Sequence, residues 1–431
     1  MTMTKRPLRR TLLGVLLAMV FIAAAVVPSF AIRADVASYV TDPTGANLYA
    51  GGSGTSEDPY HIQTVEQFSN IRRNLKAKFV LDNDLDFSGV KEWDPIGYYI
   101  PDGTDIEVAS PALSFRGKLD GKGHTIKNFR PNFASASRIG IGLDGLFASL
   151  NGKGKILNLT LTGFDVKGLG MMVGGLVGYM GGQSVLKNIH MVGENKVLGF
   201  TNVGGLVGGV NSTRYLKDCS AVCDVTLTGT TTSLKSVMAA GVLCGGGEGT
   251  SFENCKALGG SVTCLGTDVD SIGAVSGCAF DAKYFKNCSA ENVTINAKNA
   301  SMVGGLVGMA GNLEGCDKNS ARTQITGCTV KNVTINLEEG AERIGMILGG
   351  GYFRQAWRTG EESYPEPGAF VVSNCSAQGA INGGKWVGSI LGFQSRNAAV
   401  KNSKANVLWN GKKLQKQVGA SINTVSLDDL S

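Results

Sequence analysis

The stretch VGGLVG decides the fold: it occupies residues 173–178 and recurs letter for letter at 203–208 and 303–308. Five looser copies accompany it, namely LDGLFA at 143–148, AGVLCG at 240–245, IGAVSG at 272–277, IGMILG at 344–349 and VGSILG at 387–392. Self-similarity at a period of roughly 20 to 50 residues marks a repeat architecture. Eight copies therefore predict an array of similar structural units.

We call each VGGLVG-like copy a core motif. A second short motif, which we call the marker, follows each core motif. The gap from the last core residue to the last marker residue is 10 or 11 residues in six of the eight repeats. A third apolar segment, such as NVTIN at 292–296 and again at 332–336, follows in several repeats. These segments are rich in Val, Ile, Leu and Thr and are separated by Gly, Asn, Asp and Ser, which is typical of short β-strands joined by turns. The markers are ILNL at 156–159, LKNI at 186–189, LKDC at 216–219, FENC at 252–255, FKNC at 285–288, ITGC at 325–328, VSNC at 372–375 and VKNS at 400–403.

No single repeat could bury an apolar face alone, so successive repeats must stack. Segments of neighbouring repeats then pair as parallel strands ~4.8 Å apart around one continuous core. Parallel crossovers are right-handed. We therefore predict an all-β fold, a right-handed parallel β-helix (solenoid) of about eight coils. Its core glycines are expected where φ is positive, or where coils press too close for a Cβ.

Both ends of such an array need protection, because an open parallel edge invites aggregation. Thr64 and Gln67 form a capping box that predicts a short helix through about Leu75, as part of an N-terminal cap. Its apolar face is Val65, Phe68, Ile71 and Leu75. At the other end the lysine-rich LWNGKKLQK at 408–416 is expected to blunt the last edge.

The first 31 residues are typical of a secretory signal peptide. The apolar run at 12–27 ends before small residues at positions 29 and 31, and it is preceded by four basic residues, Lys5, Arg6, Arg9 and Arg10. An uncleaved membrane anchor is the alternative, but the run is shorter than the ~20 residues that span a bilayer. Removing the four charges reduces the net charge of +6 to about +2, which argues against nucleic acid as a partner.

These patterns divide the chain into five parts. They are the signal peptide at 1–31, a linker at 32–50, an N-terminal cap with the first coils at 51–135, the repeat β-helix at 136–417 and a loose tail at 418–431. After cleavage of the signal peptide we expect no membrane-spanning segment.

Half of the ten cysteines share the last marker position, which Leu159, Ile189 and Ser403 fill in other repeats. Because Leu and Ile replace them, we interpret these five as a ladder of buried thiols: Cys219, Cys255, Cys288, Cys328 and Cys375. Stacked Cβ atoms ~4.8 Å apart exceed the usual disulfide separation. Cys264 aligns with core residues, and four cysteines stay open: Cys223, Cys244, Cys278 and Cys316.

The residue before the last marker position predicts a second ladder. It is polar in seven repeats, as Asn158, Asn188, Asp218, Asn254, Asn287, Asn374 and Asn402. Stacked Asn and Asp side chains at a corner can satisfy the backbone groups of the turn.

The GGLVG core with its Asn-Cys element resembles the GLUG-motif family, short repeats of exported bacterial proteins. Upstream residues are similar to the region commonly found before such repeats. They are GGSGTSEDPYHIQTVEQFSNI at 51–71, FVLDNDLDFSG at 79–89, DPIG at 94–97 and FRGKLDGKGHTIKN at 115–128. The resemblance covers about 50–410 and implies an adhesin-like surface protein. Asp144, Ser276 and Met346 depart from the core pattern.

Two long insertions leave the same corner of adjacent coils. The core-to-marker gap grows to 20 residues before Cys328 and to 26 before Cys375. The second insertion, YFRQAWRTGEESYPEPG at 352–368, gathers aromatic and charged residues, as carbohydrate and protein recognition surfaces do. Packing of this loop on the solenoid is the alternative. The candidate ligand-binding residues are Tyr352, Phe353, Arg354, Trp357, Arg358, Glu361, Glu362 and Tyr364.

Catalytic and metal motifs are sparse. The chain has three histidines, His61, His124 and His190, and neither HExxH nor GxSxG. We interpret His124 as a turn residue and His190 as a residue of the outer face. Three aspartates alternate in LDNDLDF, as Asp82, Asp84 and Asp86. Such oxygens could hold Ca²⁺, but the interpretation we favour places them on the wet face of a strand, and we predict no metal or cofactor.

Together these observations predict a secreted or cell-surface scaffold without catalytic activity. It would bind a glycan, a host protein or another partner protein through loops on the β-helix. The alternative is a polysaccharide-active β-helix lyase or hydrolase, which would need convergent carboxylates or Ca²⁺ ligands in one groove.

Overall fold

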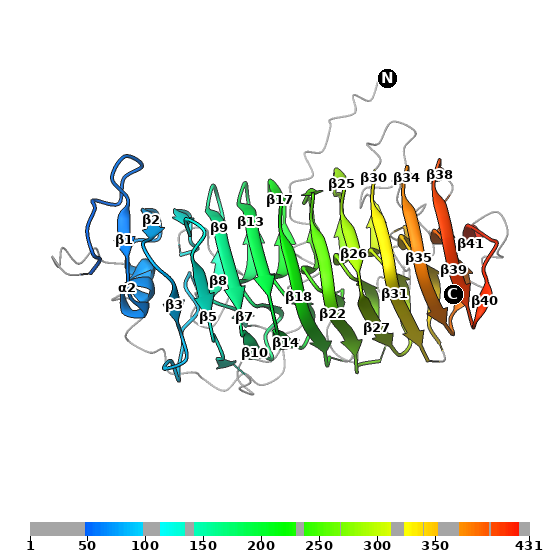
Figure 1. Cartoon of the computed structure of the whole chain (residues 1–431), viewed down its shortest axis with the longest axis horizontal. Helices are drawn as coiled ribbons and strands as arrows, with labels where there is room; N and C mark the ends of the chain where they lie inside the picture. The colour runs from blue at the N-terminus through cyan, green and yellow to red at the C-terminus, as the bar shows by residue number, and fades with distance from the viewer. Residues whose placement is uncertain are drawn as a thin grey trace, which may run out of the picture.

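The protein is a rod of stacked β-coils with a short helix at its N-terminal end (Figure 1). The computed structural model describes residues 48–97, 113–133, 142–229, 237–267, 269–311, 323–338, 340–351, 370–395 and 398–421. Its strands form three sheets in which the pairing between coils is parallel, and the predicted all-β solenoid is confirmed. No helix in the described ranges is long and apolar enough to cross a membrane.

The first residue of each VGGLVG-like copy lies in sheet C and the fifth lies in sheet B. Within the described residues sheet C has eight strands: β7 (Leu143–Asp144), β11 (Met172–Gly174), β15 (Asn202–Gly204), β19 (Ala239–Gly241), β23 (Val269–Gly273), β28 (Ala300–Gly304), β32 (Glu342–Gly345) and β36 (Lys385–Gly388). Sheet B has nine: β8 (Phe147–Leu150), β12 (Val177–Gly181), β16 (Val207–Asn211), β20 (Cys244–Glu248), β24 (Ser276–Phe280), β29 (Val307–Gly311), β33 (Leu348–Gly351), β37 (Leu391–Gln394) and β41 (Val418–Ser421).

Sheet A holds the markers and the third segments. Its strands in the N-terminal half are β1 (Tyr60–Ile62), β2 (Lys78–Leu81), β3 (Leu85–Asp86), β4 (Lys118–Asp120), β5 (Thr125–Lys127), β6 (Asn132–Phe133), β9 (Lys155–Thr162), β10 (Asp165–Gly168), β13 (Val185–Val192), β14 (Lys196–Gly199), β17 (Tyr215–Lys217) and β18 (Ser220–Leu227). The others are β21 (Phe252–Glu253), β22 (Lys256–Cys264), β25 (Tyr284–Lys286), β26 (Ser289–Glu291), β27 (Val293–Ala297), β30 (Thr323–Thr326), β31 (Thr329–Leu337), β34 (Phe370–Ser373), β35 (Ser376–Asn382), β38 (Ala399–Lys401), β39 (Lys404–Trp409) and β40 (Lys412–Lys413).

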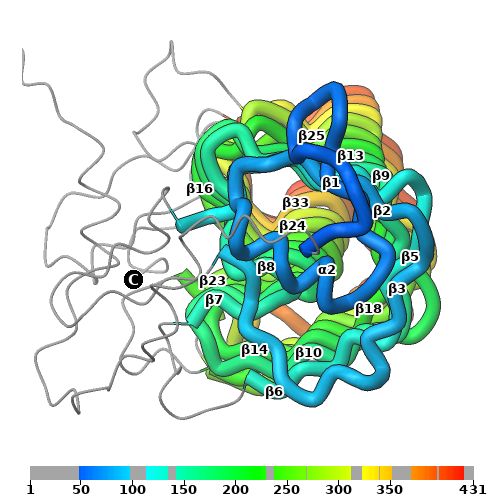
Figure 2. Tube along the Cα trace, turned by 90° about the vertical axis from the view of Figure 1, so that its left-hand side faces the viewer, coloured from blue at the N-terminus to red at the C-terminus, as the bar shows by residue number. Residues whose placement is uncertain are grey.

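Each coil runs through sheet C, sheet B and sheet A before the next begins, as β11, β12, β13 and β14 show. Seen from the N-terminal end, the chain passes from β14 through β16 to β18 clockwise while it recedes (Figure 2), which is the predicted right-handed coil. Inward side chains build one core along the rod, to which each VGGLVG contributes its valines and its leucine; Val173, Leu176 and Val177 are fully buried.

The core glycines are explained by crowding. None of the three glycines of the first VGGLVG has a positive φ. A Cβ on Gly174 would lie 2.2 Å from the carbonyl oxygen of Val177, and one on Gly208 would lie 2.5 Å from the amide nitrogen of Val173. Sheets B and C therefore pack backbone against backbone, which only glycine permits.

The polar ladder is confirmed where the structure describes it. The seven predicted residues have φ between 46° and 56°, a conformation that Asn and Asp tolerate better than other side chains. Asn188 Nδ2 donates to Asn158 Oδ1 (3.0 Å), and Asn158 Nδ2 donates to Asp120 Oδ1 (2.9 Å). Asn254 Nδ2 likewise donates to Asp218 Oδ1 over 2.8 Å.

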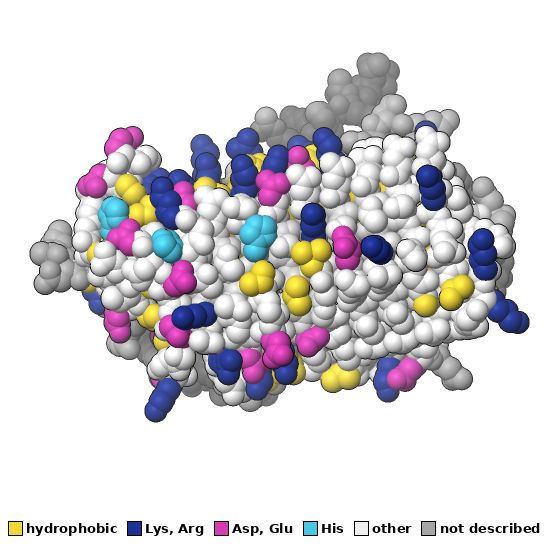
Figure 3. Space-filling view, in the orientation of Figure 1, with side chains coloured by type: hydrophobic (Ala, Val, Ile, Leu, Met, Phe, Trp, Pro, Cys, Tyr) yellow, Lys and Arg dark blue, Asp and Glu magenta, His cyan; other side chains and the backbone are white. Residues whose placement is uncertain are grey.

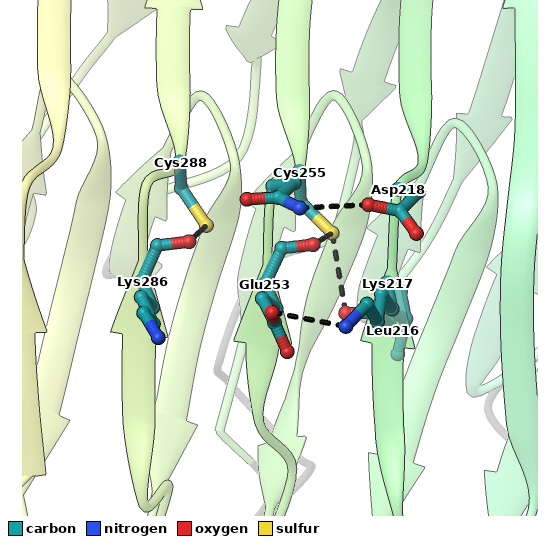
Figure 4. Close-up of polar contacts among 8 residues, drawn as sticks. Leu216, Lys217, Asp218, Glu253, Cys255, Lys286 and Cys288 are labelled. Carbon is teal, nitrogen blue, oxygen red and sulfur yellow. Dashed lines mark hydrogen bonds and ion pairs between the residues drawn. The ribbon is translucent and has the colours of Figure 1, made fainter.

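The thiol ladder is confirmed as well. Nine cysteines lie in the described residues, and all are free and buried, including Cys223, Cys244 and Cys278; Cys316 lies outside this part. Cys255 Sγ donates to the carbonyl oxygen of Glu253 (3.5 Å) and to that of Leu216 on the preceding coil (3.3 Å; Figure 4). Burial raises the pKa of Cys264 to about 12, so this thiol remains protonated.

Both ends are capped. The capping box at Thr64 is present, and α2 (Val65–Ser69) buries Phe68. The helix is shorter than predicted and continues as the 3₁₀ turn η2 (Asn70–Arg73). The carbonyl of Asn70, where α2 gives way to η2, accepts a hydrogen bond from the hydroxyl of Tyr49 over 2.8 Å.

At the C-terminus β40 turns back antiparallel on β39, with Trp409 opposite Lys412. Residues 418–421, which we expected in a loose tail, form β41 and pair with β37.

Candidate functional site

The candidate loop predicted from the sequence lies outside the described residues. This applies to the whole set of Tyr352, Phe353, Arg354, Trp357, Arg358, Glu361, Glu362 and Tyr364. The signal peptide at 1–31 lies outside them too. Their roles stay predictions. The described residues nearest to this loop along the chain and in space are considered next.

Among these residues, a cluster of charged and aromatic side chains lies on adjacent coils, and we call it the Arg343 cluster. Arg343 in β32 is 2% exposed and forms an ion pair with Glu342. Its guanidinium carbon lies 5.2 Å from the ring centroid of Trp386 in β36 and 5.8 Å from that of Phe393 in β37. Lys385 Nζ is 4.4 Å from the Trp386 ring centroid. The half-exposed indole is thus contacted by two cations, a favourable arrangement for an electron-rich ring.

Strain and incomplete pairing distinguish this cluster. Arg343 has φ 57° and Trp386 has φ 55°, values that bulky side chains rarely adopt. Nε of Arg343 is buried without a hydrogen-bond partner. Burial raises the pKa of Glu342, although Arg343 and Lys385 oppose this shift. Strained residues persist where their surroundings hold them, often at functional sites.

The Arg343 cluster adjoins the root of the candidate loop. A Cβ on Gly350 would lie 3.5 Å from the Cβ of Phe393 and 3.5 Å from the sulfur of Met302. Gly351 ends β33 and is the last described residue before 352. The described residues that lead into the predicted loop, Gly350 and Gly351, therefore lie beside the Arg343 cluster.

The N-terminal aspartates each bond to a neighbouring strand or turn. Asp82 Oδ1 lies 2.8 Å from His61 Nδ1, and Asp84 Oδ1 lies 3.4 Å from His124 Nδ1. Asp86 Oδ1 accepts from Asn128 Nδ2 over 2.9 Å. No group of three or more His, Cys, Asp or Glu in the described ranges is arranged to hold a metal ion.

His190 forms the third histidine site, on the outer face of sheet A. Its Nδ1 lies 2.8 Å from Ser220 Oγ, and its Nε2 lies 2.9 Å from Asn188 Oδ1. His190 is half-buried, and this burial lowers its pKa. We expected a plain surface residue, whereas the structure gives it two partners.

The register of sheet A explains how these partners meet. His190 lies opposite Thr160 on the preceding coil and Ser220 on the next, and Ser220 lies opposite Lys256 on the coil after that. Exposed apolar residues, Val192 and Leu258 among them, follow two positions along two of these strands. Figure 3 shows apolar side chains gathered near a histidine on this face. The sequence could reveal this row only once the repeats were aligned strand by strand.

Comparisons with known proteins add similarity over limited lengths. No family model matches the chain. A candidate Gly-rich membrane protein of Evansella cellulosilytica is 32% identical over 125 residues, covering 27% of this chain and 12% of that protein. Halomucin of Haloquadratum walsbyi is 32% identical over 136 residues, covering 30% of this chain and 1% of its own length. The chain therefore spans only a small part of these curated relatives.

Two solved structures are similar in fold. One is a candidate immunoglobulin A1 protease from Bacteroides ovatus, with TM-score 0.45, 18% identity and coverage of 89% of this chain and 88% of that chain. The other carries the name IgA1 Protease, with TM-score 0.45, 18% identity and coverage of 74% and 21%.

These names correct one prediction. We expected a protein without catalytic activity, and both solved chains are named as proteases. At 18% identity the likeness extends to the fold alone, so their activity is not transferred to this chain.

Proposed function

We propose that this protein is an exported β-helix that acts at the cell surface or outside the cell. The N-terminal residues, with four basic side chains before an apolar run, support export. The name of one relative, a candidate Gly-rich membrane protein, is in keeping with a surface location. The resemblance to the GLUG-motif family supports the same role.

We further propose that it binds a glycan through the surface that joins the Arg343 cluster to segment 352–369. The observation that carries this proposal is the partly buried Trp386 ring, which Arg343 and Lys385 both contact. A sugar ring can stack on an indole face, and Arg and Lys supply hydrogen-bond donors for hydroxyl or carboxylate oxygens. The strained backbone of Arg343 and Trp386 supports a surface held ready for a ligand. Trp357 and Tyr364 of the adjoining segment would extend it.

The test is a glycan and mucin array with the chain lacking residues 1–31. Wild type is compared with Trp386→Asn, Trp357→Ala and Trp409→Ala. Asn suits the positive φ at 386, so Trp386→Asn removes the ring without adding backbone strain. Trp409 lies on the C-terminal hairpin and is the matched control for loss of an exposed indole.

We expect Trp386→Asn and Trp357→Ala to weaken glycan binding about tenfold or more, a loss typical of a central aromatic contact. Trp409→Ala should bind like wild type. Equal binding by all four proteins would refute this surface as the binding site. Binding to protein targets but to no glycan would assign the surface to a protein partner instead.

A further inference from the structure

A serine, a histidine and an asparagine lie in hydrogen-bonding series on sheet A, far in sequence from the Arg343 cluster. Ser220 Oγ is 2.8 Å from His190 Nδ1, and His190 Nε2 is 2.9 Å from Asn188 Oδ1. A nucleophile, a base and a group that orients the base form the general pattern of an activated hydroxyl. Asn188 and His190 lie on β13, and Ser220 lies opposite His190 on β18 of the next coil.

The direction of every hydrogen bond in this series follows from one carboxylate. Asp120 can only accept, so the amide of Asn158 must point its Nδ2 toward it. Asn158 then offers Oδ1 to Asn188 Nδ2, which leaves Asn188 Oδ1 facing His190. His190 Nε2 must therefore carry the proton. Its Nδ1 is left as the acceptor, and the hydroxyl of Ser220 donates to it.

The carboxylate of Asp120 remains charged in this ladder. Burial works against its ionisation, but hydrogen bonds from Asn158, the Lys122 amide and Lys118 outweigh that effect and lower its pKa. The tautomer of His190 is thus set by a fixed anion two coils away.

The site exists because the asparagine ladder is interrupted at Asp218. A carboxylate cannot donate to Asn188, whereas an asparagine at this position could. Asp218 instead accepts from Asn254 on the following coil. The oxygen of Asn188 is consequently available to orient His190.

The next position in the row supplies a positive charge. Lys256 lies opposite Ser220 in the ladder between β18 and β22. Burial is the main cause of the lowered pKa of His190; the carboxylate of Asp218 opposes this shift, and the charge of Lys256 adds to it. The ammonium of Lys256, the residue opposite Ser220, could stabilise an oxyanion that forms when the hydroxyl attacks a carbonyl. Base, nucleophile and cation therefore stand on three consecutive coils.

We propose that Ser220, His190 and Lys256 form a second site with esterase activity, in which Asn188 is a positioning residue. Ser220 Oγ attacks the carbonyl carbon of a carboxylic ester while its proton passes to His190 Nδ1. The C–O bond to the alcohol breaks, and the alcohol leaves with that proton. Water then attacks the acyl-serine, gives a proton to Nδ1, and releases the carboxylic acid as Ser220 regains its hydrogen.

The surroundings favour esters with a small apolar acyl group. Val192 and Leu258 are 43% and 38% exposed, and they follow His190 and Lys256 by two residues on the same outer face. Side chains at i and i+2 of a strand share a face, so an apolar row runs beside the polar one. Ser220 is 9% exposed and His190 is half-buried, so an ester would have to approach the hydroxyl from the outer face of the sheet.

Two measurements test this site in the chain lacking residues 1–31. The first is labelling with a fluorophosphonate, followed by peptide mapping, and the second is hydrolysis of 4-nitrophenyl butyrate across pH. The variants are Ser220→Ala, His190→Gln and Asn188→Asp. Ser289→Ala is the matched control, because Ser289 stands in the same outward row but bonds to Glu291 rather than to a histidine.

We expect label on Ser220 and none on Ser289. Ser220→Ala should abolish enzymatic hydrolysis, and His190→Gln should reduce it by about 10²-fold or more, as loss of a general base does. Asn188→Asp should move the acid limb of the pH profile upward, because a carboxylate at Nε2 favours the imidazolium. Ser289→Ala should hydrolyse the ester like wild type.

Three outcomes would overturn the proposal: wild type unlabelled at Ser220, equal labelling of Ser289, or Ser220→Ala as fast as wild type. The labelling of wild type requires no variant to fold. A melting curve for each variant distinguishes lost chemistry from lost structure. The glycan array and the ester assay are separate measurements, so a failure of one proposal is distinguishable from a failure of the other.

Discussion

At the residue scale the fold depends on the absence of side-chain atoms. Gly174 and Gly208 occupy positions where a Cβ would meet backbone atoms of neighbouring strands at under 3.0 Å. Backbone at that distance cannot move aside as a flexible side chain can. The repeated glycines are therefore required by the direct contact between sheets B and C, and not by an unusual backbone conformation.

Gly208→Ala should be strongly destabilising. Its Cβ would lie 2.5 Å from the amide nitrogen of Val173 and 2.7 Å from the carbonyl oxygen of Gly178. We expect a loss of about 3 kcal/mol or more in the free energy of unfolding, the upper range for overpacking. Gly89→Ala is the control, because nothing lies within 4 Å of its added Cβ. Urea titration of both variants measures the difference, and equal midpoints would show that this contact is not tight.

At the scale of the element, polar ladders hold the corners of sheet A. Each step passes a hydrogen bond from the amide of one coil to the side-chain oxygen of the coil before it. Asp218 breaks this rule because it has no proton to donate. His190 Nε2 bonds to Asn188 Oδ1 instead. The replacement of Asn by Asp at one ladder position thus leaves an acceptor that a histidine can use.

Asp218→Asn should restore the ladder. The new amide could donate to Asn188 Oδ1 and still accept from Asn254, so we expect a gain of about 1 kcal/mol in the free energy of unfolding. It should also compete with His190 for Asn188. Asn254→Asp is the opposite change, since it would place two carboxylates side by side and should lower stability. Thermal melts measure both variants. A higher melting temperature for Asn254→Asp than for Asp218→Asn would contradict the claim that these ladder hydrogen bonds stabilise the corner.

The first coils should be sensitive to acid. Hydrogen bonds from Asn128 and Ser88 lower the pKa of Asp86 from 3.8 to about 2. A depressed pKa in the folded state stabilises above the unfolded value, and the contribution is lost as pH falls from about 4 to about 2. Melting temperature should therefore drop more in this window for wild type than for Asp86→Asn. Identical pH dependence in the two proteins would exclude Asp86 as a contributor.

At the scale of the whole molecule, the repeats predicted the architecture and the ladders because many copies agree in spacing. Val418 and Gly419 escaped notice, since β41 pairs in the sheet without the double glycine of the other cores. The contact of Arg343 with Trp386 spans 43 positions, and the long insertion hid their shared register. His190 and Ser220 were both visible, but their contact depends on which strand lies beside which.

Every site described above rests on coils that stack in one register along the rod. Pulsed electron spin resonance between spin labels at Lys187 and Lys401 tests this most directly. Six successive ladder pairs connect these exposed positions, through Lys217, Glu253, Lys286, Thr326 and Ser373. Each position would be changed to cysteine, and the native thiols of the described part are buried and should not react.

Six steps of ~4.8 Å predict a narrow distance distribution near ~29 Å between the labelled backbone positions. A rod labelled at only one of the two positions is the control for background spin. A broad distribution, or one centred well beyond this value, would mean that the coils do not stack in this register, and it would remove the basis of both proposed sites.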